Sequence, residues 1–280
     1  MRLRSLLFVP GDRSDRMEKA LGAGADALIL DLEDAVAPQK KAEARRAVAE
    51  FLVAHRSANL WVRINPLGGP EVDRDLGAVL PASPQGIVLP KAEGGASVDE
   101  LAHRLAAEGN ASAHILAIAT ETPAAMFQLG TYGGAKRLAG LTWGAEDLPA
   151  AIGASTSREP DGRYTPPYEL ARSLCLFGAA AAGVPAIETV YPAFRDLEGL
   201  AGYAARGRRD GFSGMMAIHP AQVEVINRAF TPSEVEIAHA RAVVAAFEAN
   251  PGAGALSLDG KMIDRPHLIQ AQRTLAAASD

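Results

Sequence analysis

Seven residues with acid-base, ionic or metal-binding side chains stand at the ends of short apolar runs. They are Glu33, Arg63, Lys91, Glu121, Asp147, Glu188 and His219. In a (β/α)₈ barrel the C-terminal ends of all parallel strands open onto one face, so residues far apart in the sequence converge on one cavity. The repeated placement therefore predicts an enzyme whose active site is built from strand ends.

Two of these residues form a candidate metal site. Glu121, in AIATET, and Asp147, in LTWGAED, are separated by about one βα unit, so we expect them on neighbouring strands at the same mouth. Mg²⁺ prefers oxygen ligands and keeps several waters, so two carboxylates and substrate oxygens can complete its shell. As an alternative, Asp147 could cap a helix that begins at Leu148. We predict that Glu121 and Asp147 bind Mg²⁺ and that Glu121 also contacts the substrate.

Arg63 is the candidate substrate-binding and catalytic cation. In WVRIN it alternates with Val62 and Ile64, so its side chain points away from their face of the strand and towards the barrel mouth. A guanidinium there offers a bidentate fork to a substrate carboxylate or to a developing enolate oxygen. The alternative is an internal ion pair with Glu33 or another carboxylate. A buried arginine is costly unless it is paired or used, which favours a function.

Residues around this site could support it. In the acidic run Asp31-Leu32-Glu33-Asp34, the two-residue period of a strand puts Asp31 and Glu33 on one side. Glu33 could hold the waters of a bound metal. It could equally form a salt bridge with one of three cations: Lys40, Lys91 or Arg63. The two roles are compatible, and we place Glu33 and Asp34 around the metal ligands.

Lys91, in VLPKAE, raises a second mechanism, because a strand-end lysine with a depressed pKa can form a Schiff base. Acidic neighbours at the same mouth would instead raise its pKa and favour the ammonium. We therefore expect Lys91 to pair with a carboxylate or to neutralise substrate charge. His219, followed by Pro220, is expected to hydrogen-bond the loop backbone, and Cys175 is expected in the core.

The first βα unit carries a group of cations: Arg4, Arg13, Arg16 and Lys19. Arg13 and Arg16 could hold a phosphorylated handle such as a nucleotide tail. They could equally form a solvated helix face. The site prediction includes both as substrate-binding residues.

Strands and helices alternate along the chain, which favours parallel βα units. Apolar runs predict strands at residues 3–9, 27–32, 60–64, 86–89, 115–119, 140–143, 184–189 and 212–218. Segments of helical length occupy residues 13–23, 40–55, 98–108, 123–129, 167–182, 196–208 and 232–249. A doubly wound nucleotide fold is disfavoured, because the turn after the first strand, PGDR, is neither GxGxxG nor a P-loop.

We predict an α/β TIM barrel, (β/α)₈, over residues 1–230 and a C-terminal helical extension over residues 231–280. A closed barrel does not need this extension for its own core. We therefore expect the extension to contact a neighbouring subunit.

Composition excludes several classes of protein. The chain has 280 residues, 48% hydrophobic and 22% charged, as in an ordinary soluble domain. A net charge of −5 gives no broad attraction to nucleic acid or to an anionic membrane. The single cysteine rules out an internal disulfide. No apolar run is long enough to span a membrane and no secretory pattern begins the chain, so we predict a cytoplasmic protein.

Several motifs together resemble one family, from Arg4 to the C-terminus. They are RSLLFVPGDR, DALILDLEDAV, WVRIN, VLPKAE, ATET, WGAEDL, GFSGMMAIHPAQ and FTPSEVEIAHA. This combination is similar to the citrate lyase β-subunit-like family of the HpcH/HpaI aldolase superfamily, which includes malyl-CoA and citramalyl-CoA lyases. No single run carries the resemblance, but the combination is specific.

The resemblance implies a Mg²⁺-dependent barrel, usually a homotrimer or a dimer of trimers, that acts on a CoA thioester. Retro-Claisen cleavage of a 3-hydroxyacyl-CoA would give acetyl-CoA and a 2-oxoacid, glyoxylate or pyruvate. By likeness, Glu121 and Asp147 hold the metal and Arg63 contacts the substrate acid. The alternatives are a malyl-CoA-type thioesterase and a β subunit of a citrate lyase complex.

The C-terminal GKMIDRP resembles the segment that supplies an aspartate across the subunit interface as acid/base in malyl-CoA and citramalyl-CoA lyases. Here that residue is Asp264. In VPAIETV, Glu188 stands where the family commonly has aspartate, and ATETPAAM has Pro123 where many relatives have another small residue. We expect the longer Glu188 to narrow the pocket and shift the acyl preference.

Overall fold

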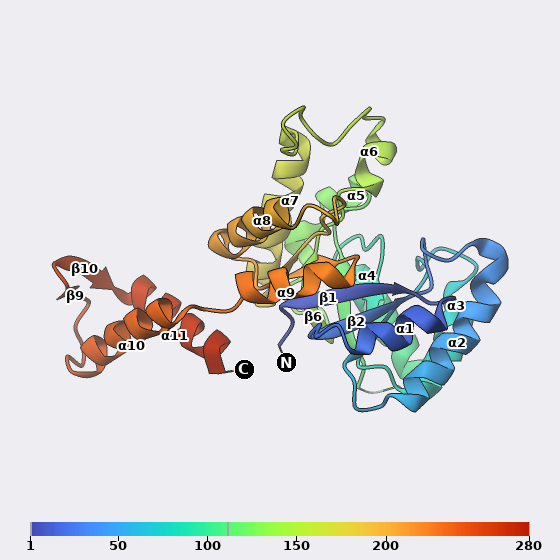
Figure 1. Cartoon of the computed structure of the whole chain (residues 1–280), viewed down its shortest axis with the longest axis horizontal. Coiled ribbons are helices and arrows are strands. Elements are labelled where there is room, and N and C mark those ends of the chain that lie inside the picture. The colour runs from blue at the N-terminus through green and yellow to red at the C-terminus, as the bar shows by residue number, and fades with distance from the viewer. Residues whose placement is uncertain (1, 111, 280) are drawn as a thin grey trace. The chain divides into compact units, whose positions relative to one another are not determined.

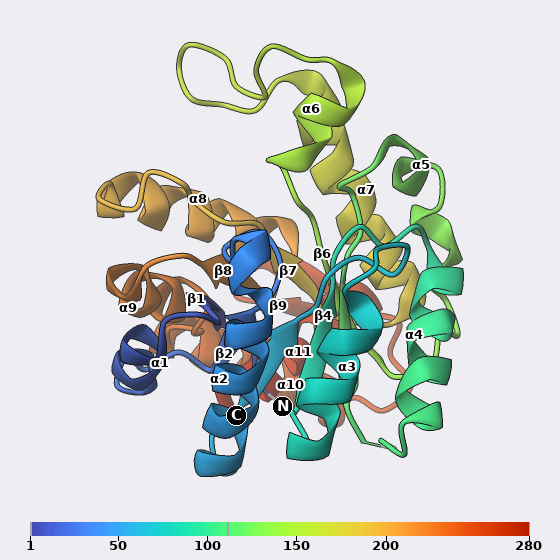
Figure 2. The same ribbon diagram turned by 90° about the vertical axis from the view of Figure 1, so that its right-hand side faces the viewer.

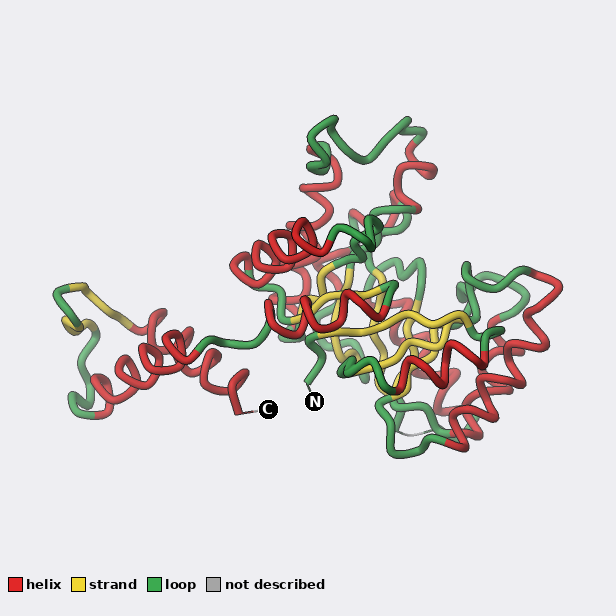
Figure 3. Tube along the Cα trace, in the orientation of Figure 1, coloured by secondary structure: helices red, strands yellow, loops and turns green. Residues whose placement is uncertain are grey.

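The computed structural model describes residues 2–110 and 112–279. Its parallel strands form a closed barrel in which each strand pairs with the next and β8 pairs with β1 (Figure 3). The strands are β1 (Ser5–Pro10), β2 (Ala27–Asp31), β3 (Leu60–Arg63), β4 (Gly86–Leu89), β5 (His114–Ile118), β6 (Leu138–Thr142), β7 (Ala186–Glu188) and β8 (Gly214–Ala217). The predicted (β/α)₈ barrel is confirmed, and every strand overlaps its predicted range.

Helices occupy the stretches between the strands (Figure 1). They are α1 (Ser14–Leu21), α2 (Lys41–Ala54), α3 (Val72–Val79), α4 (Gly95–Ala107), α5 (Pro123–Met126), α6 (Asp147–Ile152), α7 (Pro166–Ala182), α8 (Leu197–Asp210) and α9 (Pro220–Ala229). The predicted helical segments do not include α3, α6 and α9, although a helix from Leu148 was weighed as an alternative for Asp147. Helices α2 and α3 pack together outside the strands (Figure 2). No helix in the described part of the chain is long and apolar enough to cross a membrane.

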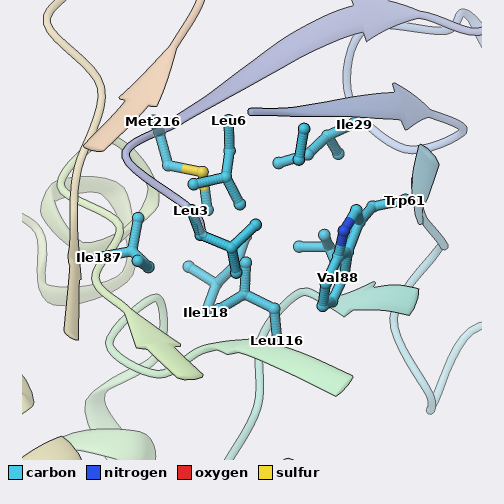
Figure 4. Close-up of a cluster of buried hydrophobic side chains, with 10 residues drawn as sticks. Leu3, Leu6, Ile29, Trp61, Val88, Leu116, Ile118, Ile187 and Met216 are labelled. Carbon is cyan, nitrogen blue, oxygen red and sulfur yellow. The ribbon is translucent and has the colours of Figure 1, made fainter. Parts of the chain in front are cut away.

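Apolar side chains fill the interior of the barrel (Figure 4). The buried cluster consists of Leu3, Leu6, Ala27, Ile29, Trp61, Val88, Leu116, Ile118, Ile187 and Met216. Trp61 on β3 fits because its partner on β4 is Gly86, where a Cβ would lie 2.3 Å from the indole ring. Strand residues two positions apart share a face, so this cluster fixes which strand-end side chains reach the mouth.

The chain divides into two compact units, one of residues Leu3–Asn227 and one that comprises Arg2 and the chain from Arg228 onward. The second unit contains α10 (Glu234–Glu248), β9 (Ala255–Leu258), β10 (Lys261–Asp264) and α11 (Arg265–Ser279). Ser233 and Glu236 form a capping box at the start of α10. The unit has its own apolar cluster, formed by Ala240, Val243, Phe247, Ile263 and Ala271.

The antiparallel hairpin of β9 and β10 is an element that the sequence reading does not predict. Its two-residue loop is Asp259-Gly260, and both residues have positive φ, 51° and 75°. Such a loop suits a tight hairpin turn, for which Asp-Gly is a favoured pair. Asp264 lies at the end of β10, so the hairpin determines its local position.

Candidate active site

A cavity of about 370 Å³ opens at the C-terminal ends of the barrel strands. Seven charged residues line it: Arg16, Asp31, Asp34, Arg63, Glu121, Glu146 and Asp147. An apolar side is lined by Phe8, Ile118, Trp143, Val190, Met216 and Ile218. A cavity with a few convergent polar groups and an apolar side is the usual form of a small-molecule site.

Arg63 lies in this cavity wall and is held by two carboxylates. Its Nε and Nη2 donate to Asp31 Oδ1 and Oδ2 at 2.7 and 2.6 Å, which is a bidentate pair. Its Nη1 lies 3.2 Å from Oε2 of Glu33. The internal ion pair considered from the sequence is therefore present, with Asp31 as the principal partner. The guanidinium is both paired and exposed to the cavity.

Asp31 also organises the loop after β2. Its Oδ1 accepts the backbone N–H of Glu33 at 2.9 Å and its Oδ2 accepts that of Ala35 at 3.1 Å. The side chain of Asp31 is 1% exposed, so these bonds form away from water and hold the loop rigidly. The sequence reading placed Asp31 beside Glu33 but gave it no role. Its position at the end of a strand, two residues before Glu33, could have indicated a role at the mouth of the barrel.

Lys91 connects three of the predicted acidic residues. Its Nζ donates to Glu33 Oε1 at 2.7 Å and lies 3.5 Å from Asp147 Oδ1, and its backbone N–H donates to Glu121 Oε2 at 2.5 Å. Burial acts to lower the Lys91 pKa, but the hydrogen bond to Glu33 and the charges of all three carboxylates raise it above its ordinary value. This agrees with the expected ammonium and disfavours Schiff-base chemistry.

The backbone of Lys91 has φ of 50°, which is unusual for a residue other than glycine. This conformation directs the Lys91 N–H at the Glu121 carboxylate while the side chain reaches Glu33. A left-handed residue costs about 1–3 kcal/mol and is retained where the surrounding structure determines it. The hydrogen bonds to Glu121 and Glu33 stabilise this conformation of Lys91.

Glu121 is a buried carboxyl group, 4% exposed, in the loop after β5. Burial, together with the charges of Glu33 and Asp147, raises its pKa to about 8. Gly144 packs against it, since a Cβ there would lie 2.8 Å from Glu121 Cγ. The absence of a side chain at Gly144 thus leaves room for Glu121 at the cavity wall.

Asp147 is the first residue of α6, so it does not act as the N-cap of a helix beginning at Leu148. Its side chain is about one third exposed and faces Lys91. Among the described residues, no group of three or more His, Cys, Asp and Glu side chains could hold a metal ion by itself. A metal at Glu121 and Asp147 would therefore need waters and substrate oxygens in its shell.

The donor set fits such an ion. Mg²⁺ is a hard cation that is usually bound through one or two carboxylates, with waters and substrate oxygens completing the shell. Glu33 Oε2 is buried without a hydrogen bond, and the pKa of Glu33 is raised by burial despite Arg63 and Lys91. A cation close to Glu33, Glu121 and Asp147 would relieve this concentration of negative charge.

The two arginines predicted to bind a phosphorylated handle differ in position. Arg16 lines the cavity, as does Asp34. Arg13 does not line it; its Nε and Nη2 donate to Asp15 at 2.9 and 3.0 Å on the exposed side of α1. Of the two, only Arg16 can reach a ligand in the cavity without a rearrangement.

Glu188 does not lie in the cavity, contrary to the expectation that it narrows the pocket. Its Oε2 accepts Arg172 Nε at 2.7 Å, and its Oε1 accepts Trp143 Nε1 at 2.5 Å. The side chain is completely buried between β7 and the helices α7 and α8. The physical reason is register: Ile187 fills the barrel interior, so the next residue points to the opposite side of the strand.

The other expectations for single residues agree with the structure. His219 Nδ1 accepts the backbone N–H of Ala221 at 3.2 Å, and its ring stacks on Phe194 at 4.9 Å between centroids. Cys175 is fully buried in α7, and burial raises the pKa of its thiol. His219 therefore supports a loop and Cys175 belongs to the core.

Asp264 lies in the second unit, at the end of β10. Its Oδ1 is 2.5 Å from His267 Nδ1, and this hydrogen bond lowers the pKa of Asp264 below its ordinary value. The side chain is about one third exposed. A charged, accessible carboxylate of this kind can accept a proton from a ligand.

A second hollow, of about 490 Å³, lies beside α8 and the loop that precedes α7. Three arginines line it, and each already has a partner. Arg158 donates to Gly162 O and Tyr164 Oη, Arg163 pairs with Asp161, and Arg206 pairs with Glu169. None of the predicted site residues lines it, so the strand-end cavity is the candidate active site.

The apolar half of the strand-end cavity could not be assigned from the sequence. Trp143, Val190 and Met216 line it, but each stands in an apolar run that reads as ordinary barrel core. Trp143 offered the clearest signal, because an indole at the end of a strand needs a partner for its N–H. That partner is Glu188.

Sequence comparisons agree with this geometry. Residues 4–220 match the HpcH/HpaI aldolase/citrate lyase family. A citrate lyase subunit beta-like protein of Mycobacterium tuberculosis is 38% identical over 275 residues, which cover 98% of this chain and 95% of the relative. A (3S)-malyl-CoA thioesterase of Cereibacter sphaeroides is 35% identical over 282 residues, which cover 98% and 94%.

Solved structures are similar over most of the chain. The crystal structure of the protein CitE from Mycobacterium tuberculosis in complex with magnesium, acetoacetate and coenzyme A has a TM-score of 0.84 and 36% identity, and covers 99% of this chain and 98% of that one. The citrate lyase beta subunit complexed with oxaloacetate and magnesium, also from M. tuberculosis, has a TM-score of 0.73 and 36% identity, and covers 81% and 96%. The chain therefore belongs to the HpcH/HpaI aldolase/citrate lyase family.

Proposed function

We propose that this protein is a magnesium-dependent lyase that cleaves a 3-hydroxyacyl-CoA of the malyl-CoA or citramalyl-CoA type to acetyl-CoA and a 2-oxoacid. The observation that carries the proposal is a single strand-end cavity lined by Glu121, Asp147 and Arg63. Family membership supports a lyase. The ligands of the similar M. tuberculosis structure, magnesium, acetoacetate and coenzyme A, are of the chemical classes that this reaction needs.

Glu121 and Asp147 would hold the metal ion, with Lys91 behind them. When bound, Mg²⁺ would act as a Lewis acid on the oxygens of the 2-oxoacid half of the substrate. Lys91 keeps Glu121 oriented through its backbone N–H, and its ammonium opposes the effect of burial, which raises the pKa of Glu33. Both contacts exist before any ligand arrives, so the site needs little reorganisation on binding.

Arg63 would bind the carboxylate of the 2-oxoacid half. Its fork is fixed by Asp31 at two points, so its remaining N–H groups are presented in one orientation. In the cleavage step, the hydroxyl of the substrate loses its proton, the adjacent carbon–carbon bond breaks, and the electron pair passes to the thioester as an enolate. Protonation of the enolate carbon then gives acetyl-CoA. The cationic wall favours the negative charge that develops on oxygen.

The CoA part of the substrate carries phosphates, and Arg16 is the cavity-lining cation able to meet one of them. Arg13, on the same helix, would join it only after leaving Asp15. An exposed arginine pair of this kind contributes little to stability, so its exchange for a phosphate is inexpensive.

The proton acceptor in this proposal is Asp264, supplied across a subunit interface in a homotrimer. The lowered pKa keeps the carboxylate charged, so that it can accept the hydroxyl proton, and lets it give that proton up readily afterwards. The hydrogen bond from His267 holds its orientation. The second unit has its own apolar cluster, as a segment that crosses to a neighbouring subunit would need.

Replacing Asp264 by asparagine tests this role. We expect lyase turnover to fall by about 10²–10⁴-fold, because general acid-base catalysis contributes that much. The mass of the assembly and its affinity for Mg²⁺ should not change. Asp259→Asn, in the loop of the same hairpin, removes the same charge and is the matched control. Near-normal turnover of Asp264→Asn would remove Asp264 from the mechanism.

A thioesterase is the second candidate, because relatives of 35% identity are named (3S)-malyl-CoA thioesterases. Attack of water on the thioester carbonyl in the same cavity would release free CoA and the intact hydroxyacid. A β subunit of a citrate lyase assembly is a third, since a protein so named from Leuconostoc mesenteroides is 34% identical. Such a subunit would act on a carrier-bound citryl thioester.

One experiment separates these functions. The purified protein is incubated with malyl-CoA, citramalyl-CoA, methylmalyl-CoA and citryl-CoA, with and without Mg²⁺, and the products are identified. A lyase releases acetyl-CoA or its homologue and an oxoacid only with Mg²⁺, whereas a thioesterase releases free CoA. No turnover of any ester, with an acyl carrier protein co-purifying, would favour the citrate lyase subunit.

A further inference from the structure

Glu188 is a buried carboxylate that contacts the cavity wall from behind. Its Oε1 accepts three hydrogen bonds, from Trp143 Nε1 at 2.5 Å, from the backbone of Thr189 at 3.0 Å and from Tyr203 Oη at 3.0 Å. Its Oε2 accepts Arg172 Nε at 2.7 Å. Hydrogen bonds to a charged, water-excluded acceptor are strong and define geometry closely.

Two of these donors belong to the cavity wall. Trp143 follows β6 and Thr189 follows β7, and both line the cavity although Glu188 does not. The hydrogen bond from Nε1 fixes the plane of the indole. A phenyl ring at the same position has no N–H and could not make this bond. Trp143 also packs edge-on against Tyr164, with ring centroids 5.0 Å apart. One carboxylate thus holds the ends of two adjacent strands in a defined relation.

Arg172 holds the carboxylate in its place. The guanidinium is 3% exposed, donates to both Glu188 and Asp210, and lies over the Phe212 ring at 4.7 Å. Movement of Glu188 would leave the buried Arg172 with Asp210 as its carboxylate partner and without its fully buried contact to Glu188, which is costly. The Trp143 indole is therefore bonded to a carboxylate that is itself held in place.

We propose that Glu188 is a positioning residue that sets the width of the apolar side of the cavity through Trp143, and thereby selects the substituent on the oxoacid carbon. This inference rests on the proposed lyase function. Aspartate at this position would withdraw the carboxylate by one methylene, about 1.5 Å. The indole would then lose its bond or follow the carboxylate outwards, and the cavity would accept a bulkier substituent more readily.

The test compares Glu188→Asp, Trp143→Phe and the double variant. Each is assayed for kcat/KM on malyl-CoA and citramalyl-CoA, which differ by one methyl group. In Glu188→Asp we expect the ratio of the two values to shift towards citramalyl-CoA by about 10- to 30-fold, at the lower end of the range that one methylene controls in a pocket. The double variant should have the same ratio as Trp143→Phe alone.

An optical measurement tests the link between the two residues without turnover. The chain has two tryptophans, so the emission of wild type minus that of Trp143→Phe isolates the Trp143 signal. Subtracting the emission of the double variant from that of Glu188→Asp gives the emission of Trp143 when it lies beside the shorter carboxylate. We expect a shifted emission maximum and a changed response to pyruvate or glyoxylate added with Mg²⁺.

The matched control is Glu169→Asp, because Glu169 on α7 pairs with Arg206 of α8 and has no contact with Trp143. It should leave both the ratio and the emission unchanged. Wild type that turns over neither ester contradicts the proposed function, whereas the emission arm still reports on Glu188 and Trp143. Turnover with an unchanged ratio in Glu188→Asp, or equal effects of Glu188→Asp in both Trp143 backgrounds, overturns the positioning role.

Discussion

Two buried arginine–carboxylate pairs stand at the ends of barrel strands, and only one faces the cavity. Arg63 and Asp31, on β3 and β2, lie in the cavity wall and make a bidentate pair. Arg172 of α7 and Glu188 of β7 make an equally close pair behind the wall. The chemistry of the two pairs is similar, so position alone separates the pair proposed to bind substrate from the pair that supports the wall.

One residue of strand register accounts for the difference. Ile29 fills the barrel interior, and Asp31, two positions later, faces the same side and reaches the mouth. Ile187 fills the interior on β7, and Glu188, one position later, faces the helices. Because side chains alternate with a period of two, a shift of one residue reverses the role of a strand-end charge.

The largest expected effect concerns the pair behind the wall. Glu188→Ala leaves Arg172 buried with only its contact to Asp210, so we expect the free energy of unfolding to fall by about 3–5 kcal/mol. Urea denaturation measures it. Glu169→Ala, which breaks a half-exposed pair on the same helix, should cost only about 0–1 kcal/mol. Equal costs for the two variants would contradict the burial argument.

The pair that faces the cavity should instead affect activity. Arg63→Lys keeps the charge but loses the fork, so we expect kcat/KM to fall by about 10²-fold, or about 2.7 kcal/mol, with Mg²⁺ affinity unchanged. The matched control is Arg4→Lys, because Arg4 makes a bidentate pair with Asp26 and does not line the cavity. A loss of less than threefold in Arg63→Lys would show that Arg63 is merely structural.

The barrel itself follows from apolar runs, because parallel strands buried on both faces read as continuous Leu, Ile, Val and Ala. Because such strands show no alternation of polar and apolar residues, the sequence does not indicate which residues face the interior of the barrel. In VPAIETV nothing in the sequence indicates whether Ile187 or Glu188 faces inward, whereas WVRIN places a charge between apolar neighbours and its orientation is readable. The orientation of Arg63 towards the cavity was therefore predicted correctly, and Glu188 was assigned to the wrong side.

Other omissions have local causes. Helix α3, VDRDLGAV, is short and mixes buried Asp75 with apolar residues, so its pattern is weak. The hairpin after α10 carried an Asp-Gly turn signal, but its strands, ALSL and KMID, are short and half exposed. Asp264 was found only through the resemblance, because no local pattern distinguishes it from other exposed carboxylates.

The acidic half of the cavity should bind Mg²⁺ in a pH-dependent way. With a pKa of about 8, Glu121 is protonated at lower pH and must release that proton to bind Mg²⁺. Apparent Mg²⁺ affinity should rise by up to about tenfold per pH unit towards pH 8 and then level off. Titration calorimetry in buffers of different ionisation enthalpy measures the released proton. Affinity that does not vary below pH 8 would contradict this assignment.

The stability of the metal-free protein should change with pH in the opposite direction and fall as the pH rises. The folded pKa of Glu121 lies above its ordinary value of 4.5, so the folded state binds the proton more tightly than the unfolded state. The contribution of this group to metal-free stability is therefore complete below about pH 4.5 and is lost as the pH rises to about 8. Mg²⁺ should restore stability most at the upper end of this range.

We propose above all that the carboxylates that follow β5 and β6 hold the metal ion on which turnover depends. Calorimetric titration of Mg²⁺ into wild type, Glu121→Gln and Asp147→Asn, each with pyruvate present, tests it most directly. We expect one Mg²⁺ site in wild type and at least tenfold weaker Mg²⁺ binding in both variants. The control is Glu93→Gln, an exposed carboxylate two residues after Lys91, and its Mg²⁺ affinity should not change. Equal Mg²⁺ affinity in all four proteins would contradict it.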